Sequence, residues 1–253
     1  MRLRLIRHAT LRVEFAGLQL LVDPMLDETG ARPAVENTAN DRRNPLVPLP
    51  VPAAEVVAGV DAVLVTHLHA DHLDTGAVEA LDLGVPLFCQ PEDEAALRER
   101  GFTDVRPVDA AAPFGEGLLI SRTAARHGSG EVGERMAPAS GFVLAADAEP
   151  TLYVAGDTIW CDEVAAALAA HQPDVTVVNA GAAQFLEGGP ITMDAADVID
   201  LAQGVPSTQV VAVHMEAINH CLLTRDELRR HLRRMGLAAW VLVPEDGEEM
   251  LFD

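Results

Sequence analysis

Hydrophobic and polar positions divide the chain into a few short β-strands followed by a regular alternation of strands and helices. Arg2–His8 and Leu11–Phe15 alternate apolar and polar side chains, and Leu18–Val22 is a continuous apolar run. Alternation with a period of two is typical of a strand with one buried face, and a continuous run is typical of a strand buried on both faces. The first segment is therefore predicted to be a β-meander that ends at Asp23-Pro24.

From residue 61 onward, apolar runs alternate with segments that have a helical period. The predicted strands are Ala62–Val65, Pro86–Cys89, Leu118–Thr123, Gly141–Ala146, Thr151–Ala155, Val175–Val178, Gln209–Val213 and Ala239–Val243. The predicted helices are Asp74–Leu83, Pro91–Arg100, Trp160–Ala170, Met193–Ala202 after a Thr192 cap, and a helix to Met235 that opens with the capping box Thr224–Glu227. This order predicts an α/β fold in which two mixed sheets pack together with helices outside, a four-layer αββα sandwich.

A long irregular segment separates the meander from the alternating part of the chain. Residues Met25 to Pro52 contain many of the prolines and the polar run Asn37–Asn44. Irregular segments of this length inside a compact domain are usually functional or disordered, and we expect this one to be an active-site loop. The strand pattern continues beyond it, so residues 1–253 are predicted to form a single domain.

Composition excludes several classes of protein. The hydrophobic share of 49% argues against disorder, and 18 basic against 39 acidic side chains give a net charge of −21, which disfavours nucleic acid as a partner. The N-terminus lacks a signal-peptide layout and no uncharged apolar run approaches membrane-spanning length, so we expect a cytoplasmic protein without a membrane span. Three scattered cysteines indicate no disulfide framework. The sequence leaves the oligomeric state, including a homo-oligomer, open.

Candidate chemistry is concentrated in the run Thr66-His67-Leu68-His69-Ala70-Asp71-His72, directly after the strand Ala62–Val65. Imidazole and carboxylate groups are ligands of divalent transition metals. In an extended backbone His67 and His69 project to the same side and can face one ion. Four side chains are too few for two ions, but His127, Asp157 and His214 each follow a later strand. The sequence therefore predicts a metal site built at strand ends.

These residues resemble the metallo-β-lactamase fold superfamily. The opening run matches its HxHxDH signature, and His127, Asp157 and His214 fall in the order of its later ligands. The resemblance covers nearly the whole chain, and the meander with Asp23-Pro24 together with Gly156-Asp157-Thr158 looks like the L-ascorbate-6-phosphate lactonase-like branch. It implies two metal ions whose ligands are as follows: His67, His69 and His127 for the first, Asp71, His72 and His214 for the second, and Asp157 as a bridge.

The resemblance implies a metal-dependent hydrolase. Two cations lower the pKa of a shared water and generate hydroxide, which attacks an ester or lactone in a small, anionic metabolite. Asp71 is the expected proton acceptor from that water, with Asp157 as the other catalytic carboxylate. Zinc is the first expectation for the metal, and the same ligands accept manganese or iron. A phosphodiesterase on the same dinuclear site and a metal-binding protein without turnover remain as alternatives.

Weaker signals leave further alternatives. Leu5-Ile6-Arg7-His8-Ala9-Thr10 resembles the N-terminal signature of histidine phosphatases, which would need a second catalytic histidine and more arginines for phosphate. In the metal hypothesis His8 lies in the first strand, near the site mouth or behind the ligands. The remaining candidates each have a functional and a plain structural interpretation: Asp23 orienting a ligand histidine or forming a turn, Arg42 and Arg43 binding an anion or staying solvated, Asn179 donating to an oxyanion or forming a turn, and His220 contacting substrate or packing in a loop.

Overall fold

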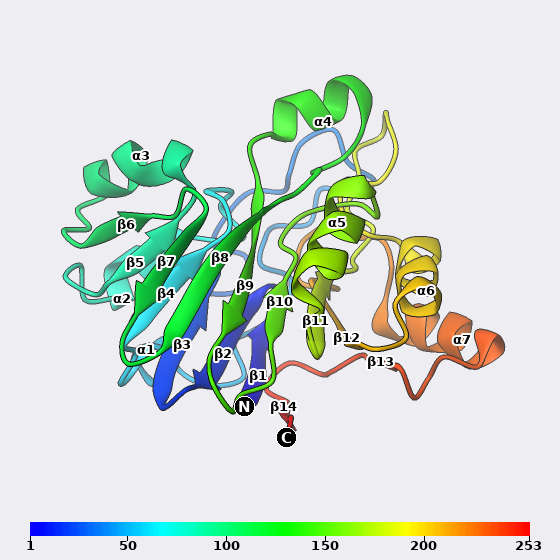
Figure 1. Ribbon diagram of the computed structural model, residues 1–253. Helices are drawn as coiled ribbons and strands as arrows, with labels where there is room; N and C mark the ends of the chain where they lie inside the picture. Colours follow the sequence, from blue (N-terminus) through cyan, green and yellow to red (C-terminus); the bar gives the residue numbers. More distant parts are fainter.

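Two mixed β-sheets of seven strands each face one another in the computed structural model, which describes residues 1–253 (Figure 1). The first sheet has the order β14-β1-β2-β3-β4-β5-β6 and the second the order β13-β12-β11-β10-β9-β8-β7. The first sheet contains β1 (Arg2–Arg7), β2 (Thr10–Phe15), β3 (Leu18–Val22), β4 (Ala62–Val65), β5 (Leu87–Cys89), β6 (Val105–Pro107) and β14 (Glu249–Leu251). The second contains β7 (Ala111–Phe114), β8 (Leu118–Ala124), β9 (Ser140–Ala145), β10 (Leu152–Val154), β11 (Val175–Asn179), β12 (Gln209–Val213) and β13 (Val241–Leu242).

The two sheets repeat one pairing scheme. Antiparallel pairs run from β14 to β3 and from β7 to β10, and parallel pairs run from β3 to β6 and from β10 to β13. Parallel strands need a crossover connection, which places helices on the outer faces. The predicted four-layer sandwich of two mixed sheets is therefore confirmed.

Helices cover the outer face of each sheet (Figure 1). On the first sheet lie α1 (Ala53–Val57), α2 (Thr75–Ala80), the 3-10 turn η1 (Pro91–Asp93) and α3 (Glu94–Glu99), and on the second lie α5 (Asp162–His171), α6 (Ala195–Gly204) and α7 (Arg225–Met235). The short α4 (Gly130–Met136) lies at one end of the sandwich. None of these helices has the length and apolar character needed to cross a bilayer.

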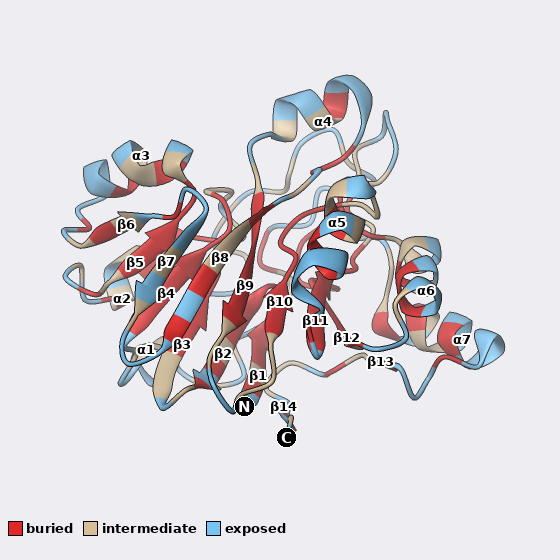
Figure 2. Cartoon of the chain, viewed as in Figure 1, coloured by how far each residue is buried: buried red, intermediate tan, exposed pale blue.

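Three apolar layers hold the sandwich together, as the buried strands of Figure 2 show. Between the sheets, 22 buried residues form one cluster that includes Phe15, Phe88 and Phe142. A second cluster of 19 residues lies under α5–α7, and a third of 15 lies under α1–α3. Central strands such as β11 are buried on both faces, which explains their continuous apolar runs.

The element predictions hold for the central strands and are wrong at several other places. β3 and β12 have the predicted bounds, and the capping box of α7 forms, with Thr224 as the N-cap. The cap of α6 is Asp194, whose Oδ1 accepts from two backbone N–H groups, because the Thr192 hydroxyl is taken by the Ala183 N–H. The predicted strand Ala239–Val243 shortens to β13, and the sequence pattern missed α1, α4, β6, β7 and β14.

The long loop Met25–Pro52 is tied to the core by buried side chains. Asn219 accepts the Val35 N–H at 2.9 Å and the Asn44 Nδ2 at 2.8 Å. Its own Nδ2 donates to the Thr38 Oγ1 at 2.7 Å and the Asn40 carbonyl at 2.9 Å. This one amide therefore holds four positions of a loop that has no helix or strand of its own.

A second anchor of the loop is Arg7, which is fully buried. Its Nη2 donates to the carbonyls of Met25 and Asp27, at 2.8 and 2.9 Å, and its Nη1 donates to the carbonyl of Val47 at 3.0 Å. Burial lowers the pKa of Arg7 to about 10, so the guanidinium stays charged at neutral pH. Both ends of the loop are therefore fixed to the end of β1.

We expect Asn219→Ala to loosen this loop while the sandwich stays folded. The substitution leaves several buried backbone groups without partners, which costs about 2–4 kcal/mol of the free energy of unfolding. Chemical denaturation measures that loss, and limited proteolysis should show new cleavage between residues 30 and 44. Glu36→Ala, an exposed position in the same loop, is the control. Equal protease resistance of Asn219→Ala and the unmodified protein would contradict the role given to Asn219.

Candidate metal centre

Strand ends from both sheets bring the candidate ligands to one edge of the sandwich. His8 follows β1 and the His67–His72 run follows β4, while His127, Asp157 and His214 follow β8, β10 and β12. All are buried except His69 and Asp71, which are partly exposed. Each site residue thus begins where its strand leaves the sheet and its backbone is free to turn.

The ligating atoms form two groups, within each of which all atoms lie within 4.8 Å of one another. His67, His69, His127 and Asp157 make the first group. His8, Asp71, His72 and His214 make the second. The structure therefore brings together all seven predicted ligands in the predicted division, and it adds His8 to the second group.

Asp157 lies between the two groups. Its Oδ2 is 3.3 Å from the His127 Nε2 and 3.4 Å from the His72 Nε2, and its Oδ1 is 3.3 Å from the His214 Nε2. This position fits the predicted bridge between two ions. Asn179 fixes it, because its Nδ2 donates to Oδ1 at 2.6 Å. The Asn179 amide is thereby committed to a carboxylate.

The residue before Asp157 has to be glycine. Gly156 has a φ of +68°, and a Cβ there would lie 2.5 Å from the carbonyl oxygen of Ser140. Side chains are excluded at that separation, and the left-handed backbone disfavours L-residues as well. This tight turn is what aims Asp157 between the two groups of histidines.

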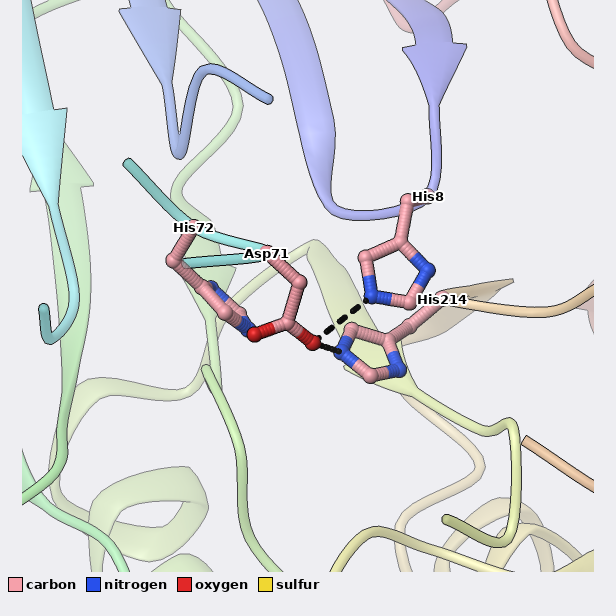
Figure 3. Close-up of side chains that lie close together, drawn as sticks. All are labelled: His8, Asp71, His72 and His214. Carbon is pink, nitrogen blue, oxygen red and sulfur yellow. Dashed lines mark hydrogen bonds and ion pairs between the residues drawn. The ribbon is translucent and has the colours of Figure 1, made fainter. Parts of the chain in front are cut away.

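His8 is a full member of the second group (Figure 3). Its Nε2 is 3.1 Å from the Asp71 Oδ2, and the same oxygen is 3.5 Å from the His214 Nε2. The rings of His8 and His214 lie 3.5 Å apart, and the His214 N–H donates to the His8 carbonyl at 2.9 Å. Both residues have left-handed backbones, with φ of 62° and 66°, a strained conformation that is concentrated at functional sites.

The alternative of a histidine phosphatase finds no support in this geometry. Such an enzyme needs free arginines around its histidine to bind phosphate. The neighbouring Arg7 is instead committed to three backbone carbonyls. The ring of His8 faces Asp71 and His214, so His8 lies among the candidate metal ligands.

Further side chains and carbonyls fix the orientation of the ligands. The Asp23 Oδ2 is 2.8 Å from the His72 Nδ1, and its two oxygens also accept the N–H and hydroxyl of Thr66. The Nδ1 of His127 is 2.7 Å from the carbonyl of Ile191. Such partners of the outer ring nitrogen leave Nε2 free to face a cation. Asp23 is thus placed to orient a ligand histidine.

The donor atoms fit divalent cations. The Nε2 atoms of His72 and His214 are buried and have no hydrogen-bond partner, and unpaired buried nitrogens are rare unless an ion or water completes them. Three imidazoles and carboxylate oxygens in each group suit zinc, manganese or iron. The residues present therefore fit two metal ions.

Electrostatics keep most ligands in the form that binds metal. Burial lowers the pKa of His67 and His127, so both rings are neutral at neutral pH. Burial by itself raises the pKa of the Asp71 carboxyl, but the nearby rings of His214 and His8 hold that pKa well below its usual range. Asp157 behaves in the same way, chiefly through the charges of His214 and His72. Both carboxylates are therefore ionised and ready to ligate.

His72 is the exception among the ligands. Burial alone lowers its pKa, but the carboxylates of Asp157 and Asp23 outweigh burial and raise that pKa well above the usual imidazole value. The two anions thus favour a positive charge at this position. A divalent cation bound by His72 and Asp157 would supply the charge in place of the proton, so metal binding would release that proton.

The other candidates lie around this centre without joining either group. Arg42 is exposed, and Arg43 donates to the carbonyls of Gly30 and Ala31 within the loop. His220 is buried with its ring stacked on Phe185, and burial lowers its pKa to about 4. Sequence reasoning missed Arg32, which lines a pocket together with Asp71, and Asn219, which holds the loop, because both positions depend on how the loop packs.

Comparisons with known proteins agree with this geometry. The family model of the beta-lactamase superfamily domain matches residues 19–215. The chain is 38% identical to the UPF0173 protein YddR of Bacillus subtilis (strain 168) over 100% of both chains, and 29% identical to a UPF0173 metal-dependent hydrolase of Azorhizobium caulinodans over 98% of both. The chain belongs to the UPF0173 metal-dependent hydrolases of the metallo-β-lactamase superfamily.

Solved structures of similar proteins extend the likeness to the whole fold. The isothiocyanate hydrolase from Delia radicum gut bacteria is 39% identical, with a TM-score of 0.95 over 100% of this chain and 99% of that chain. A possible metal-dependent hydrolase from Veillonella parvula DSM 2008 is 32% identical, with a TM-score of 0.95 over 99% and 98%. The UPF0173 fold and its two groups of ligands thus define this chain as a metal-dependent hydrolase with a dinuclear-type site.

We expect Asp157→Ala to lose bound metal and activity together, because this carboxylate faces both groups. Elemental analysis should give up to two divalent ions per chain for the unmodified protein and a smaller content for the variant, with activity lowered at least about 100-fold. Asp162→Ala, an exposed carboxylate at the start of α5, is the control. Full activity in metal-free Asp157→Ala protein would exclude the metal-dependent mechanism.

A milder change should separate orientation from ligation. Asp23→Asn keeps the size of the side chain but removes the carboxylate that holds the Nδ1 of His72. Loss of such an outer partner lowers metal affinity about 10–100-fold. Competition with a chromogenic chelator measures that affinity. An affinity equal to that of the unmodified protein would show that His72 keeps its orientation without Asp23.

Proposed function

We propose that the protein hydrolyses small molecules at an electrophilic carbon and that isothiocyanates are its substrate class. The full-length likeness at 39% identity to an isothiocyanate hydrolase carries the proposal. The site geometry supports it, because a small pocket of about 270 Å³ opens beside Asp71. Five of its eight lining residues are the apolar Pro33, Ala34, Val35, Ala70 and Ile218, which suit a neutral substituent.

The residues of the centre have defined tasks in this reaction. Divalent ions, when bound, lower the pKa of a water molecule and polarise the substrate. Asp157 and the histidines would hold the ions at the ends of the strands, and the Asp71 carboxylate would accept the proton of the attacking water. The water oxygen bonds to the central carbon of R–N=C=S, the electron pair of the C=N bond moves to nitrogen, and nitrogen takes up a proton. The resulting thiocarbamic acid splits into the amine and carbonyl sulfide.

An ester or lactone of a small, anionic metabolite is the second candidate, in line with the lactonase-like branch. The guanidinium of Arg32 in the same pocket favours it, because arginine binds carboxylates and phosphates. A phosphodiester has weaker support, since Arg32 is the pocket's single cationic side chain and is already paired with Asp27 at 3.0 Å. Zinc is our first choice of metal, followed by manganese and iron.

A direct comparison of substrates tests the proposal. Metal-loaded protein is incubated separately with phenyl isothiocyanate, a γ-lactone and bis(4-nitrophenyl) phosphate. Release of amine reports the first, release of acid the second and release of nitrophenol the third. We expect amine release that stops on chelation and that falls at least about 100-fold in Asp71→Asn protein shown to retain its metal, because a general base contributes that much. Turnover of the lactone or the phosphodiester without amine release would replace the isothiocyanate proposal by the corresponding alternative.

A further inference from the structure

The pocket beside Asp71 is built from three segments far apart in sequence. One wall consists of loop residues, among them Arg32, Val35 and Asn44. The rest consists of Ala70, Asp71 and Ile218. Its volume is about 270 Å³, and an apolar cavity of about 150 Å³ is known to take up benzene. The pocket thus has room for a substituted aryl group next to the second group of ligands.

The wall that the loop contributes is preformed. Arg32 and Asn44 exchange both backbone hydrogen bonds, at 2.8 and 2.9 Å. The Asn44 side chain accepts the Asn219 N–H at 2.9 Å and donates to the Asn219 Oδ1 at 2.8 Å. A wall held in this way loses little conformational freedom when a ligand binds.

Among the side chains that line this pocket, Arg32 has a donor nitrogen without a partner. The side-chain amide of Asn44 is taken by Asn219, and the other lining side chains are apolar or, in Asp71, carboxylate. The Arg32 Nε forms an ion pair with the Asp27 Oδ2 at 3.0 Å, whereas its Nη2 is buried and has no partner. Unpaired buried donors are costly, so an acceptor brought by the substrate stabilises this arrangement.

The charges around Arg32 define the kind of acceptor. The Asp27 Oδ2 lies 3.0 Å from the Arg32 Nε, which balances the charge of the guanidinium. Because Asp27 already pairs with the guanidinium, Arg32 offers no unpaired positive charge to a carboxylate on the substrate. A neutral oxygen acceptor would receive a hydrogen bond from Arg32 without disturbing that pair.

We propose that Arg32 determines substrate specificity by donating a hydrogen bond to a neutral oxygen acceptor on the substrate's apolar substituent. The substituent packs against Val35 and Ile218 while the reacting carbon lies at Asp71. This inference rests on the proposed function for the identity of the reacting group. The recognition itself depends only on the pocket, so binding can be tested apart from turnover.

The test compares two nearly isosteric substituents, 4-acetylphenyl and 4-isopropylphenyl, on metal-loaded protein. As isothiocyanates they report kcat/KM, and as unreactive acetanilides they report Kd by calorimetry. We expect the unmodified protein to prefer the acetyl compound about tenfold or more in both assays, the range for a hydrogen bond to a charged donor. In Arg32→Leu the ratio should fall to about one, while Arg230→Leu, an exposed arginine on α7, should keep it.

The outcomes separate the two proposals. In one outcome the protein turns over no isothiocyanate, but it still prefers the acetyl acetanilide and Arg32→Leu loses that preference. This outcome would overturn the proposed reaction and support the role of Arg32 in the pocket. The role of Arg32 is overturned if the unmodified protein shows no preference for the acetyl compound. It is also overturned if that preference survives in Arg32→Leu or disappears in Arg42→Leu instead. The double variant Asp27→Asn/Arg32→Leu removes both charges together, and it replaces the single variant if the unpaired Asp27 prevents folding.

Discussion

The structure depends on two carboxylates, the partly exposed Asp71 and the buried Asp157, that lie among six imidazoles. Removing a carboxylate from water costs several kcal/mol unless a partner compensates the charge. Divalent cations bound by these carboxylates and by the buried, unpartnered Nε2 atoms of His72 and His214 would supply that compensation. Metal binding would then contribute to the stability of this edge.

Gathering these side chains at one edge also constrains how the two sheets are arranged. The ligands come from both sheets, so β1 and β4 of one sheet must end at the same edge as β8, β10 and β12 of the other. The hydrogen bond from the His214 N–H to the His8 carbonyl ties the sheets together at that edge. The left-handed backbones of His8, Asp23 and His214 carry strain that the packed sandwich supports. A rigid apolar core is thus the condition for holding the eight candidate ligands together at one edge.

The sequence predicts what is local and fails where distant segments meet. His67–His72 is readable because the ligands and the preceding strand are consecutive, and His127, Asp157 and His214 are readable because each ends an apolar run. His8 joins the second group of candidate ligands because β1 ends beside β12. The spacing of residues along the chain does not reveal that contact. The role of Asn219 and the pocket position of Arg32 likewise follow from how the loop packs. β14 was missed because three residues that pair with β1 form too short a pattern.

Asp71 is where chemistry and specificity meet. Its carboxylate faces His8 and His214 on one side, and it lines the pocket formed by the Met25–Pro52 loop on the other. The same loop is fixed by Arg7, the residue directly before His8, and by Asn219, five residues after His214. The segments that place the second group of ligands therefore also place the substrate pocket. A change in the loop can alter which molecule reaches Asp71 without moving a ligand, because the anchors belong to the rigid sandwich and the pocket wall belongs to the loop.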